Sequence, residues 1–191
     1  MVKNQRKVFI FSAPSGAGKT TIVRAMMKQF DIFAFSVSAT TRSPRPNEQD
    51  GVDYHFFSQT DFFQKTQEGV FLEWEEVYPG RYYGTLLSEV NRIIDQGKCP
   101  IFDVDVKGGC SIKEYYKENA VAIFIKPPSV ETLRQRLIGR KSESIEEIDR
   151  RMKRVAEELT FAKRFDYVVV NDVLETALEE VANIIRKESQ R

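Results

Sequence analysis

Residues 12–21 read S-A-P-S-G-A-G-K-T-T, a glycine-rich stretch between an apolar run and a segment of helical composition. The apolar run, Lys7–Phe11, is rich in β-branched and aromatic residues, as buried strands are, and Thr20–Phe30 contains no helix breaker. A strand, a glycine-rich turn and a helix in this order form the context of a phosphate-binding loop. The pattern of such loops is G-x-x-x-x-G-K-[ST], but here Ala13 takes the place of the first glycine.

The residues that carry the chemistry of a phosphate loop are all present. Gly16 and Gly18 allow close backbone approach and positive φ angles, and the N–H groups at the helix start favour an anion. Lys19 offers a charge to the β- and γ-phosphates, and the Thr20 hydroxyl can coordinate Mg²⁺. Alanine at position 13 is tolerated if its φ is negative. A turn that binds nothing is the alternative, but such a turn does not require this residue set, so we predict a phosphate loop.

Strand and helix signals alternate along the rest of the chain. Helical segments, such as Leu86–Gln96 with Gly97 as its C-cap, separate apolar runs of strand length. This alternation predicts an α/β fold whose parallel sheet is covered by helices on both faces. The further predicted strands are Pro100–Val104, Ala120–Ile125 and Tyr167–Val170.

Capping signals predict where the last two long helices begin. Ser144-Ile-Glu-Glu147 is a capping box that opens a charged helix. Asp172-Val-Leu-Glu175 is predicted to cap the final helix. The apolar side chains expected on one face of that helix are Leu174, Leu178, Val181 and Ile185.

Two stretches interrupt the alternation, and we interpret them as insertions on a single domain. Residues 36–85 are rich in Thr, Arg, Pro and aromatic residues, and residues 127–154 begin with two prolines and are rich in arginine. The expected domain spans residues 5–187, with a core made of residues 5–35, 86–126 and 155–187.

Composition excludes several classes of protein. The chain has 191 residues, 29 basic and 28 acidic side chains and a net charge of +1, so nothing global indicates nucleic-acid or membrane binding. Two cysteines predict neither a disulfide framework nor a zinc site, and the single histidine, His55, argues against a histidine-based triad. The apolar run near the N-terminus is too short for a signal sequence, so we expect a cytoplasmic protein.

Basic residues in the insertions predict a second anion site. Arg42 and Arg45 flank Pro44 in a Thr/Ser-rich loop, and two guanidinium groups suit a phosphate dianion, with Tyr54 and Tyr83 as possible phenolic donors. A solvated basic loop is an equally weighted alternative on these residues alone. The arginines of the second insertion form either a salt-bridged surface or a lid over a transferring phosphoryl group; they are Arg134, Arg136, Arg140, Arg150, Arg151 and Arg154.

Two carboxylates follow the predicted strand Pro100–Val104. Carboxyl ends of parallel strands meet at one edge of a sheet, so Asp103 and Asp105 should share a cleft with the glycine-rich loop. They are candidates for ordering Mg²⁺ or contacting substrate, and capping of local backbone is the alternative. A phosphate acceptor is already ionised near neutral pH, so no general base is needed.

Beyond these features, the sequence resembles guanylate kinases from about Val8 to about Arg186. This chain departs from the family pattern in the glycine-rich loop, where Ala13 replaces the first glycine. It also departs at Lys107, where a neutral or acidic residue is more usual. The motifs that carry the resemblance, in chain order, are A-P-S-G-A-G-K-T-T, S-V-S-A-T-T-R-S-P-R, G-V-D-Y-H-F, F-L-E-W, Y-Y-G-T, I-F-D-V-D, P-P-S-V-E-T-L-R-Q-R-L-I-G-R and V-V-N-D.

The resemblance implies phosphorylation of GMP, and of dGMP, to the diphosphate by Mg·ATP in the cytoplasm. It implies a phosphate-loop core, a GMP-binding insertion at residues 36–85 and a helical lid at 127–154, with no nucleic acid, membrane or obligate protein partner. Thr20 would bind Mg²⁺. The catalytic residues it implies are Lys19, Arg42, Arg136, Arg140 and Arg151. Those for ATP are Ala13, Pro14, Ser15, Gly16, Ala17, Gly18, Lys19, Thr20, Thr21 and Asn171. Those for GMP are Ser38, Arg42, Arg45, Tyr54, Glu73, Tyr83, Thr85, Asp103 and Asp105.

The guanine assignment has a chemical basis once the resemblance points to it. A carboxylate such as Glu73 can accept the N1–H and N2–H₂ donors of guanine, and a hydroxyl such as Thr85 can donate to O6. Two other hypotheses remain: a catalytically inactive scaffold domain that binds phosphorylated peptides, and a kinase for another nucleotide or a sugar phosphate. The intact Lys19 and Thr20 speak against the first, and Glu73 against the second.

Overall fold

The computed structural model describes residues 6–139 and 145–190 of the chain. A parallel five-stranded sheet with the order β2-β7-β1-β8-β9 forms the core, and β1 (Val8–Ser12) is its central strand. The strands predicted from the sequence are confirmed with shifts of one residue or less, and β2 is an addition that the sequence analysis missed. The other core strands are β2 (Phe33–Phe35), β7 (Cys99–Asp103), β8 (Ala120–Lys126) and β9 (Tyr167–Val170).

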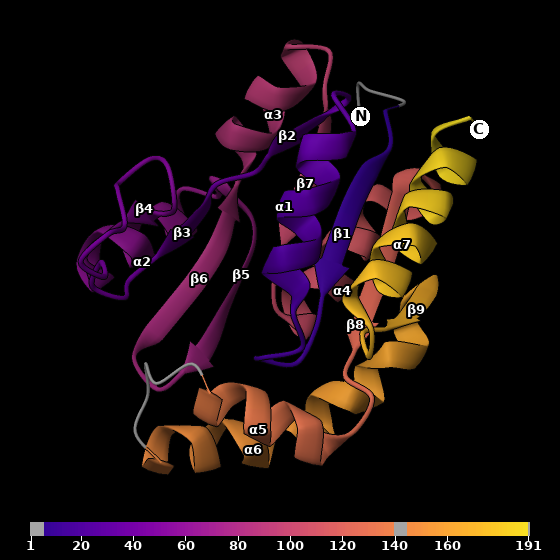
Figure 1. The fold of residues 1–191 in the computed structure, drawn as a ribbon. Coiled ribbons are helices and arrows are strands. Elements are labelled where there is room, and N and C mark those ends of the chain that lie inside the picture. The colour runs from indigo at the N-terminus through magenta and orange to yellow at the C-terminus, as the bar shows by residue number, and fades with distance from the viewer. Residues whose placement is uncertain (1–5, 140–144, 191) are drawn as a thin grey trace.

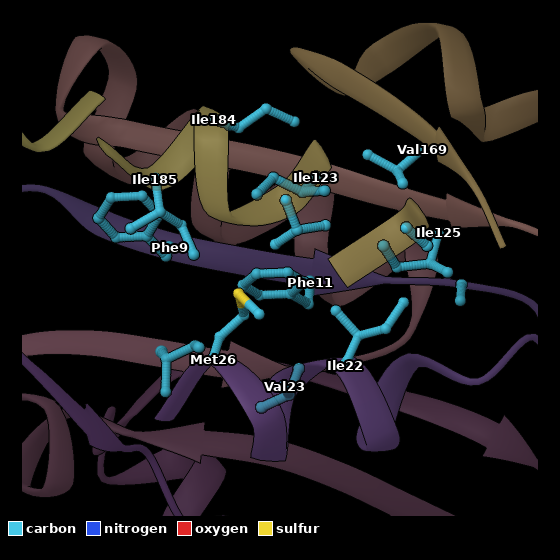
Figure 2. Packing of buried hydrophobic residues seen from close by; sticks show 14 of the residues in the cluster. Phe9, Phe11, Ile22, Val23, Met26, Ile123, Ile125, Val169, Ile184 and Ile185 are labelled. Carbon is cyan, nitrogen blue, oxygen red and sulfur yellow. The ribbon is translucent and has the colours of Figure 1, made fainter. Parts of the chain in front are cut away.

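The apolar character of β1 follows from its position, because both of its faces are covered. Phe9 and Phe11 belong to the hydrophobic cluster on one face of the sheet, and Val8 and Ile10 to the cluster on the other. Figure 2 shows the first cluster, in which side chains of α1 reach up to Phe11. All five residues of β1 are buried, so this strand is fixed from both sides.

Helices cover both faces of the sheet, as predicted (Figure 1). α1 (Lys19–Gln29) and α7 (Leu174–Ser189) contact one another and share the first cluster, whereas α3 (Leu87–Asp95) and α4 (Val106–Tyr116) contribute to the second. Gly97 follows α3 with a φ of 75°, in agreement with the predicted cap.

The predicted cap of α7 by Asp172 is wrong. The N-cap residue is Val173, and no side chain caps this helix. The start of α7 is set by packing instead, because Ala177, Val181 and Ile185 are fully buried against the sheet and dock the helix without a polar cap. The predicted apolar face is confirmed, with Leu174 and Leu178 partly buried against the same cluster.

The first insertion builds a second, smaller sheet with the order β4-β3-β6-β5. Beside it lies α2 (Gln59–Gln67), whose N-cap Ser58 accepts a hydrogen bond from the Asp61 backbone N–H. Figure 1 shows this unit standing to one side of the core sheet. Its strands are β3 (Ser38–Thr40), β4 (His55–Phe56), β5 (Phe71–Tyr78) and β6 (Arg81–Leu86).

Two helices, α5 (Val130–Gly139) and α6 (Ile145–Thr160), run across the end of the molecule where β1 meets the glycine-rich loop (Figure 1). The predicted capping residue Ser144 lies outside the described residues. Short 3₁₀ turns at Lys117–Asn119 and Phe161–Arg164 precede β8 and β9. Within residues 6–139 and 145–190, none of the helices combines the length and the apolar character needed to cross a membrane.

Phe62 of α2 anchors the second sheet. It is fully buried and stacks on Phe71 with ring centroids 4.6 Å apart, and the rings of Trp74 and Tyr82 surround it. This small aromatic core attaches α2 to β5 and β6 and so fixes the strands that face the cleft.

We expect Phe62→Ala to lower the free energy of unfolding by about 3–5 kcal/mol, because it leaves a cavity among these rings. Phe63→Ala, at a partly exposed ring, serves as the control and should cost about 1 kcal/mol. Urea titration followed by the fluorescence of Trp74, the only tryptophan, measures both. Equal losses in the two variants would contradict the anchoring role of Phe62.

Candidate active site

A cleft of about 410 Å³ opens where the carboxyl ends of β1 and β7 meet the second sheet. The core contributes the glycine-rich loop, Asp103 and Asp105, the second sheet contributes polar side chains, and α6 contributes Arg151. Most of the residues implied for the site therefore line one space. They are Ala13, Pro14, Ser15, Gly16, Ala17, Gly18, Lys19, Thr20, Thr21, Ser38, Arg42, Arg45, Tyr54, Glu73, Tyr83, Asp103, Asp105 and Arg151.

The glycine-rich loop has the backbone that anion binding requires. Gly16 and Gly18 have φ angles of 95° and 92°, which residues other than glycine rarely adopt. Ala13 is not among the described residues with positive φ, so alanine fits at the end of β1 as expected. Gly18 caps α1 without a side-chain hydrogen bond, which leaves the N-terminus of that helix available to a phosphate.

Parallel pairing of β1 with β7 places a carboxylate beside this loop. Phe11 lies opposite Asp103 in the sheet, and Asp103 and the two residues after it line the cleft. Lys19 Nζ lies 2.5 Å from Asp103 Oδ1 and donates to the Val104 carbonyl at 2.6 Å. The Thr20 hydroxyl donates to Asp103 Oδ2 at 2.8 Å. One carboxylate therefore orients the side chains of both Lys19 and Thr20.

Asn171 braces the loop from the end of β9. Its Nδ2 donates to the Ala17 carbonyl at 2.7 Å, and the side chain is buried. A side chain at Gly18 would collide with this amide, so glycine at this position allows the close approach as well as the positive φ. Asn171 thus holds the loop, a contact that the sequence did not predict.

Strand register aligns three polar residues in the second sheet. Ser38 of β3 pairs with Thr85 of β6, and Thr85 pairs with Glu73 of β5. A register shift between Phe71 and Glu73 precedes the row, and such irregularities re-aim side chains near binding sites. The Thr85 hydroxyl donates to Glu73 Oε1 at 2.6 Å, so this oxygen is held in place.

Burial changes the titration of Glu73. Its side chain is only 9% exposed, and this burial raises its pKa to about 7, with the Asp105 carboxylate adding to the effect and the Thr85 hydrogen bond opposing it. Asp105 itself caps α4, accepting from the backbone N–H groups of Lys107 and Gly108. The capping alternative is thus present for Asp105, while Asp103 binds the loop.

A basic cluster lies in the loop that follows β3. The Arg42 guanidinium makes two hydrogen bonds to Glu48, at 2.8 and 2.9 Å, and lies over the Tyr54 ring. Burial alone would lower the pKa of Arg42, but its contacts with Glu48 and Tyr83 outweigh that effect and raise it. Glu48 also accepts from the Arg45 backbone N–H at 2.8 Å. This carboxylate organises the loop, and the sequence analysis missed it.

Tyr54, Tyr83 and Arg45 complete that side of the cleft. The two tyrosine rings meet edge to face, and burial raises the pKa of Tyr54 to about 12, so its hydroxyl remains a donor at neutral pH. The Arg45 side chain is 64% exposed, with its NH1 3.8 Å from Glu48. Cations and hydroxyl donors therefore gather around one point, as a phosphate group requires.

The long helix α6 spans from the glycine-rich loop to the tip of the second sheet. Arg151 donates to the Ser15 hydroxyl and lies 5.8 Å from the centre of the Tyr78 ring. Arg154 lies over the same ring at 4.8 Å and donates to the Val77 carbonyl. Burial raises the pKa of Glu158, which also lines the cleft. The sequence predicted Arg154 only as one of several surface or lid arginines, and it did not predict Glu158 as a site residue.

The remaining arginines of the second insertion differ in their surroundings. Arg136 donates to the Asn171 carbonyl at 2.9 Å and lines an adjoining groove with Gly16 and Thr21 rather than the main cleft. Arg134 pairs with Asp149 on the exposed surface, as the salt-bridged alternative predicts. Arg140 lies outside the described residues. Lys107 Nζ is 4.0 Å from Glu157 on α6.

A parallel sheet whose central strand leads into a glycine-rich phosphate-loop motif, with a basic cluster facing that loop across the cleft, is the architecture of a phosphate-loop kinase. The sequence profile described as guanylate kinase matches residues 5–188. The chain belongs to the guanylate kinase family.

Individual relatives agree with this membership. Guanylate kinase from Bacteroides fragilis is 48% identical over 183 residues, which cover 96% of this chain and 90% of the relative. The enzyme named guanylate kinase from Thermotoga maritima is 43% identical, and the match covers 95% of this chain and 87% of the relative. The crystal structure of guanylate kinase from Anaplasma phagocytophilum superposes with a TM-score of 0.79 at 29% identity, covering 97% of this chain and 87% of the other.

We expect Asn171→Ala to destabilise the protein by about 1–3 kcal/mol, because the buried Ala17 carbonyl loses its donor. Asp172→Ala is the neighbouring control and should change stability by about 0.5 kcal/mol or less, since Asp172 is exposed and does not cap α7. Urea unfolding followed by circular dichroism measures both. A larger loss in Asp172→Ala than in Asn171→Ala would contradict the assignment of Asn171 as the brace.

Proposed function

We propose that the protein transfers the γ-phosphoryl group of ATP to GMP, forming ADP and GDP, and that it also accepts dGMP. The observation that carries this proposal is the buried Glu73 carboxylate, which faces the same cleft as the phosphate loop. A buried acid in a nucleotide cleft needs a partner with hydrogen-bond donors, and guanine offers two adjacent N–H donors.

Base discrimination follows from the chemistry of Glu73 and Thr85. An ionised Glu73 accepts from guanine N1–H and N2–H₂, and Ser38 supplies a hydroxyl from the same row of the sheet, while the Thr85 hydroxyl donates to the carboxylate and holds it in place. Adenine has an unprotonated N1 and no N2 amine, so it would leave the carboxylate unpaired. Polar mismatches of this kind discriminate by about 10⁴-fold or more.

The acceptor phosphate is proposed to bind between Arg42, Arg45, Tyr54 and Tyr83. Glu48 holds Arg42 and the Arg45 backbone before the acceptor binds, so this carboxylate arranges the cations for a dianion. Its pKa is lowered by the hydrogen bond with Arg42, which keeps it charged at neutral pH. The acceptor is therefore fixed at both ends, base and phosphate.

Transfer requires positioning and charge compensation more than proton transfer. An oxygen of the GMP phosphate attacks the γ-phosphorus, and the bond from that phosphorus to the bridging oxygen of ADP breaks. Lys19 and Arg151 are proposed to offset the charge that spreads over the transferring group, joined by Arg136 and Arg140 when the lid closes. The GMP phosphate is already ionised, so no side chain needs to remove a proton.

The loop residues fit a magnesium ion that accompanies ATP. Mg²⁺ is held in such sites by one or two protein oxygens together with substrate phosphates, and Thr20 and Asp103 present a hydroxyl and a carboxylate side by side. Among the described residues there is no group of three or more metal-binding side chains, in keeping with such a sparse site. When bound, the ion would neutralise charge on the β- and γ-phosphates.

The remaining parts of the proposal concern organisation. Residues 36–85 act as the GMP-binding insertion and residues 127–154 as the lid, while the adenine lies along the groove of Asn171 and Arg136. The partners are the small molecules ATP and GMP, with no nucleic acid, membrane or obligate protein partner, and the site of action is the cytoplasm.

Coupled assay of ADP formation with GMP, dGMP, AMP, CMP, UMP and dTMP tests the function. We expect turnover with GMP and dGMP and losses of at least about 10⁴-fold with AMP. Glu73→Ala should reduce use of GMP selectively, whereas Lys19→Ala should lower turnover with every acceptor by at least about 100-fold. Comparable activity with AMP would refute the guanine assignment, and inactivity of the folded protein with all acceptors would favour a scaffold.

The raised pKa of Glu73 predicts a pH-dependent affinity for GMP. Below about pH 7 the carboxyl is protonated, and it must ionise to accept both guanine donors. The dissociation constant for GMP should therefore fall as pH rises toward 7, by up to about tenfold per unit, and level off above it.

Calorimetric titration between pH 5.5 and 8.5 measures this dependence. Glu73→Gln is the matched control, because it keeps the ionisation of the GMP phosphate and removes that of residue 73. The folding stability of the ligand-free protein should depend on pH in the opposite direction. Between pH 4.5 and about 7 the folded state binds a proton at Glu73 that the unfolded state has lost, so the contribution of Glu73 to the free energy of unfolding declines as pH rises through this range. Identical pH profiles for the protein and Glu73→Gln would contradict the assignment.

A further inference from the structure

We infer that Gly108 is a positioning residue for GMP, because its missing side chain is the space that the Glu73 carboxylate occupies. A Cβ atom on Gly108 would lie 2.7 Å from Glu73 Oε2 and 3.2 Å from its Cδ. Carbon and oxygen atoms that are not bonded do not approach so closely. The inference rests on the proposed function and adds a residue to its specificity site.

The two oxygens of Glu73 are held by different elements. Oε1 accepts from the Thr85 hydroxyl on the neighbouring strand, whereas Oε2 lies against the first turn of α4 at Gly108. The backbone N–H of Gly108 is already bonded to Asp105, so the glycine gives Oε2 room rather than a donor. The position of the carboxylate is thus set by a hydrogen bond on one side and by the surface of α4 on the other.

A larger residue at position 108 would displace the Glu73 carboxylate rather than disrupt the fold. Gly108 lies outside the left-handed region, and alanine favours the helix more than glycine does. The atoms that a methyl group meets first are the end of a flexible side chain, not backbone. The carboxylate therefore yields, and its displacement breaks the geometry for guanine while the helix stays intact.

The neighbouring glycine provides a matched control. A Cβ atom on Gly109 would lie 3.1 Å from Phe165 Cζ and 3.4 Å from Ile10 Cγ2, both in the hydrophobic core. Gly109→Ala should strain packing on the buried face of α4 and leave the cleft unchanged. Two adjacent glycines in one helix are thus expected to fail in different ways, one in substrate binding and one in stability.

Steady-state kinetics and thermal melting of Gly108→Ala and Gly109→Ala test the inference. Gly108→Ala should raise the KM for GMP by about 10- to 100-fold, because a displacement of the binding group by about 1 Å is costly, while the KM for ATP and the Tm stay near those of the parent protein. Gly109→Ala should lower the Tm and leave the KM for GMP unchanged. An unchanged KM for GMP in Gly108→Ala, or a larger loss of Tm in it than in Gly109→Ala, would overturn the inference.

A double-mutant cycle with Glu73→Ala separates this inference from the proposed function. If Gly108 acts through the carboxylate, Gly108→Ala should have little further effect on GMP use once Glu73 is alanine. If Gly108→Ala impairs GMP use equally in the protein with Glu73 and in the Glu73→Ala variant, the positioning role is overturned. If Glu73→Ala itself leaves GMP selectivity unchanged, the proposed function fails at its base reader and the role of Gly108 fails with it. A selective loss in Glu73→Ala without one in Gly108→Ala overturns the inference alone.

Discussion

The parallel pairing of β1 with β7 is the constraint on which the rest of the site depends. It brings Asp103 level with the end of β1, where the chain turns into the glycine-rich loop. Lys19 and Thr20 then share that carboxylate, and the first turn of α1 is oriented toward the cleft. Because β1 is buried on both faces, the loop is attached to a strand that is packed from both sides.

Two buried polar side chains elsewhere in the site are each held by a partner from another segment of the chain. Asn171, directly after β9, supports the loop through Ala17, and Thr85 on β6 holds Glu73 on β5. Burial without such partners would cost several kcal/mol, so these contacts are well ordered before any substrate arrives. Preorganisation of this kind suits a reaction in which positioning and electrostatics supply most of the rate enhancement.

Much of the core was predictable because its signals are local. The predicted strands are continuous apolar runs, and the glycines, Lys19 and Thr20 indicate the phosphate loop. The failures were local too. Asp172 has the chemistry of a helix cap, yet burial of Ala177 and Val181 decides where α7 begins. The strand Phe33–Phe35 is too short for a sequence signal and exists because β7 pairs with it.

The sequence by itself determined the α/β core, the phosphate loop and the family, since these depend on residue type and short spacing. Only the tertiary structure decided which side chains of the site meet. Glu48 has no motif of its own until the chain turns it onto Arg42, and Gly108 is an ordinary helix residue until β5 brings the Glu73 carboxylate against it. The contact between Gly108 and Glu73 joins segments far apart in the chain, and strand register and packing fix its geometry. The contact between Arg42 and Glu48 lies within one loop, and the fold of that loop fixes it.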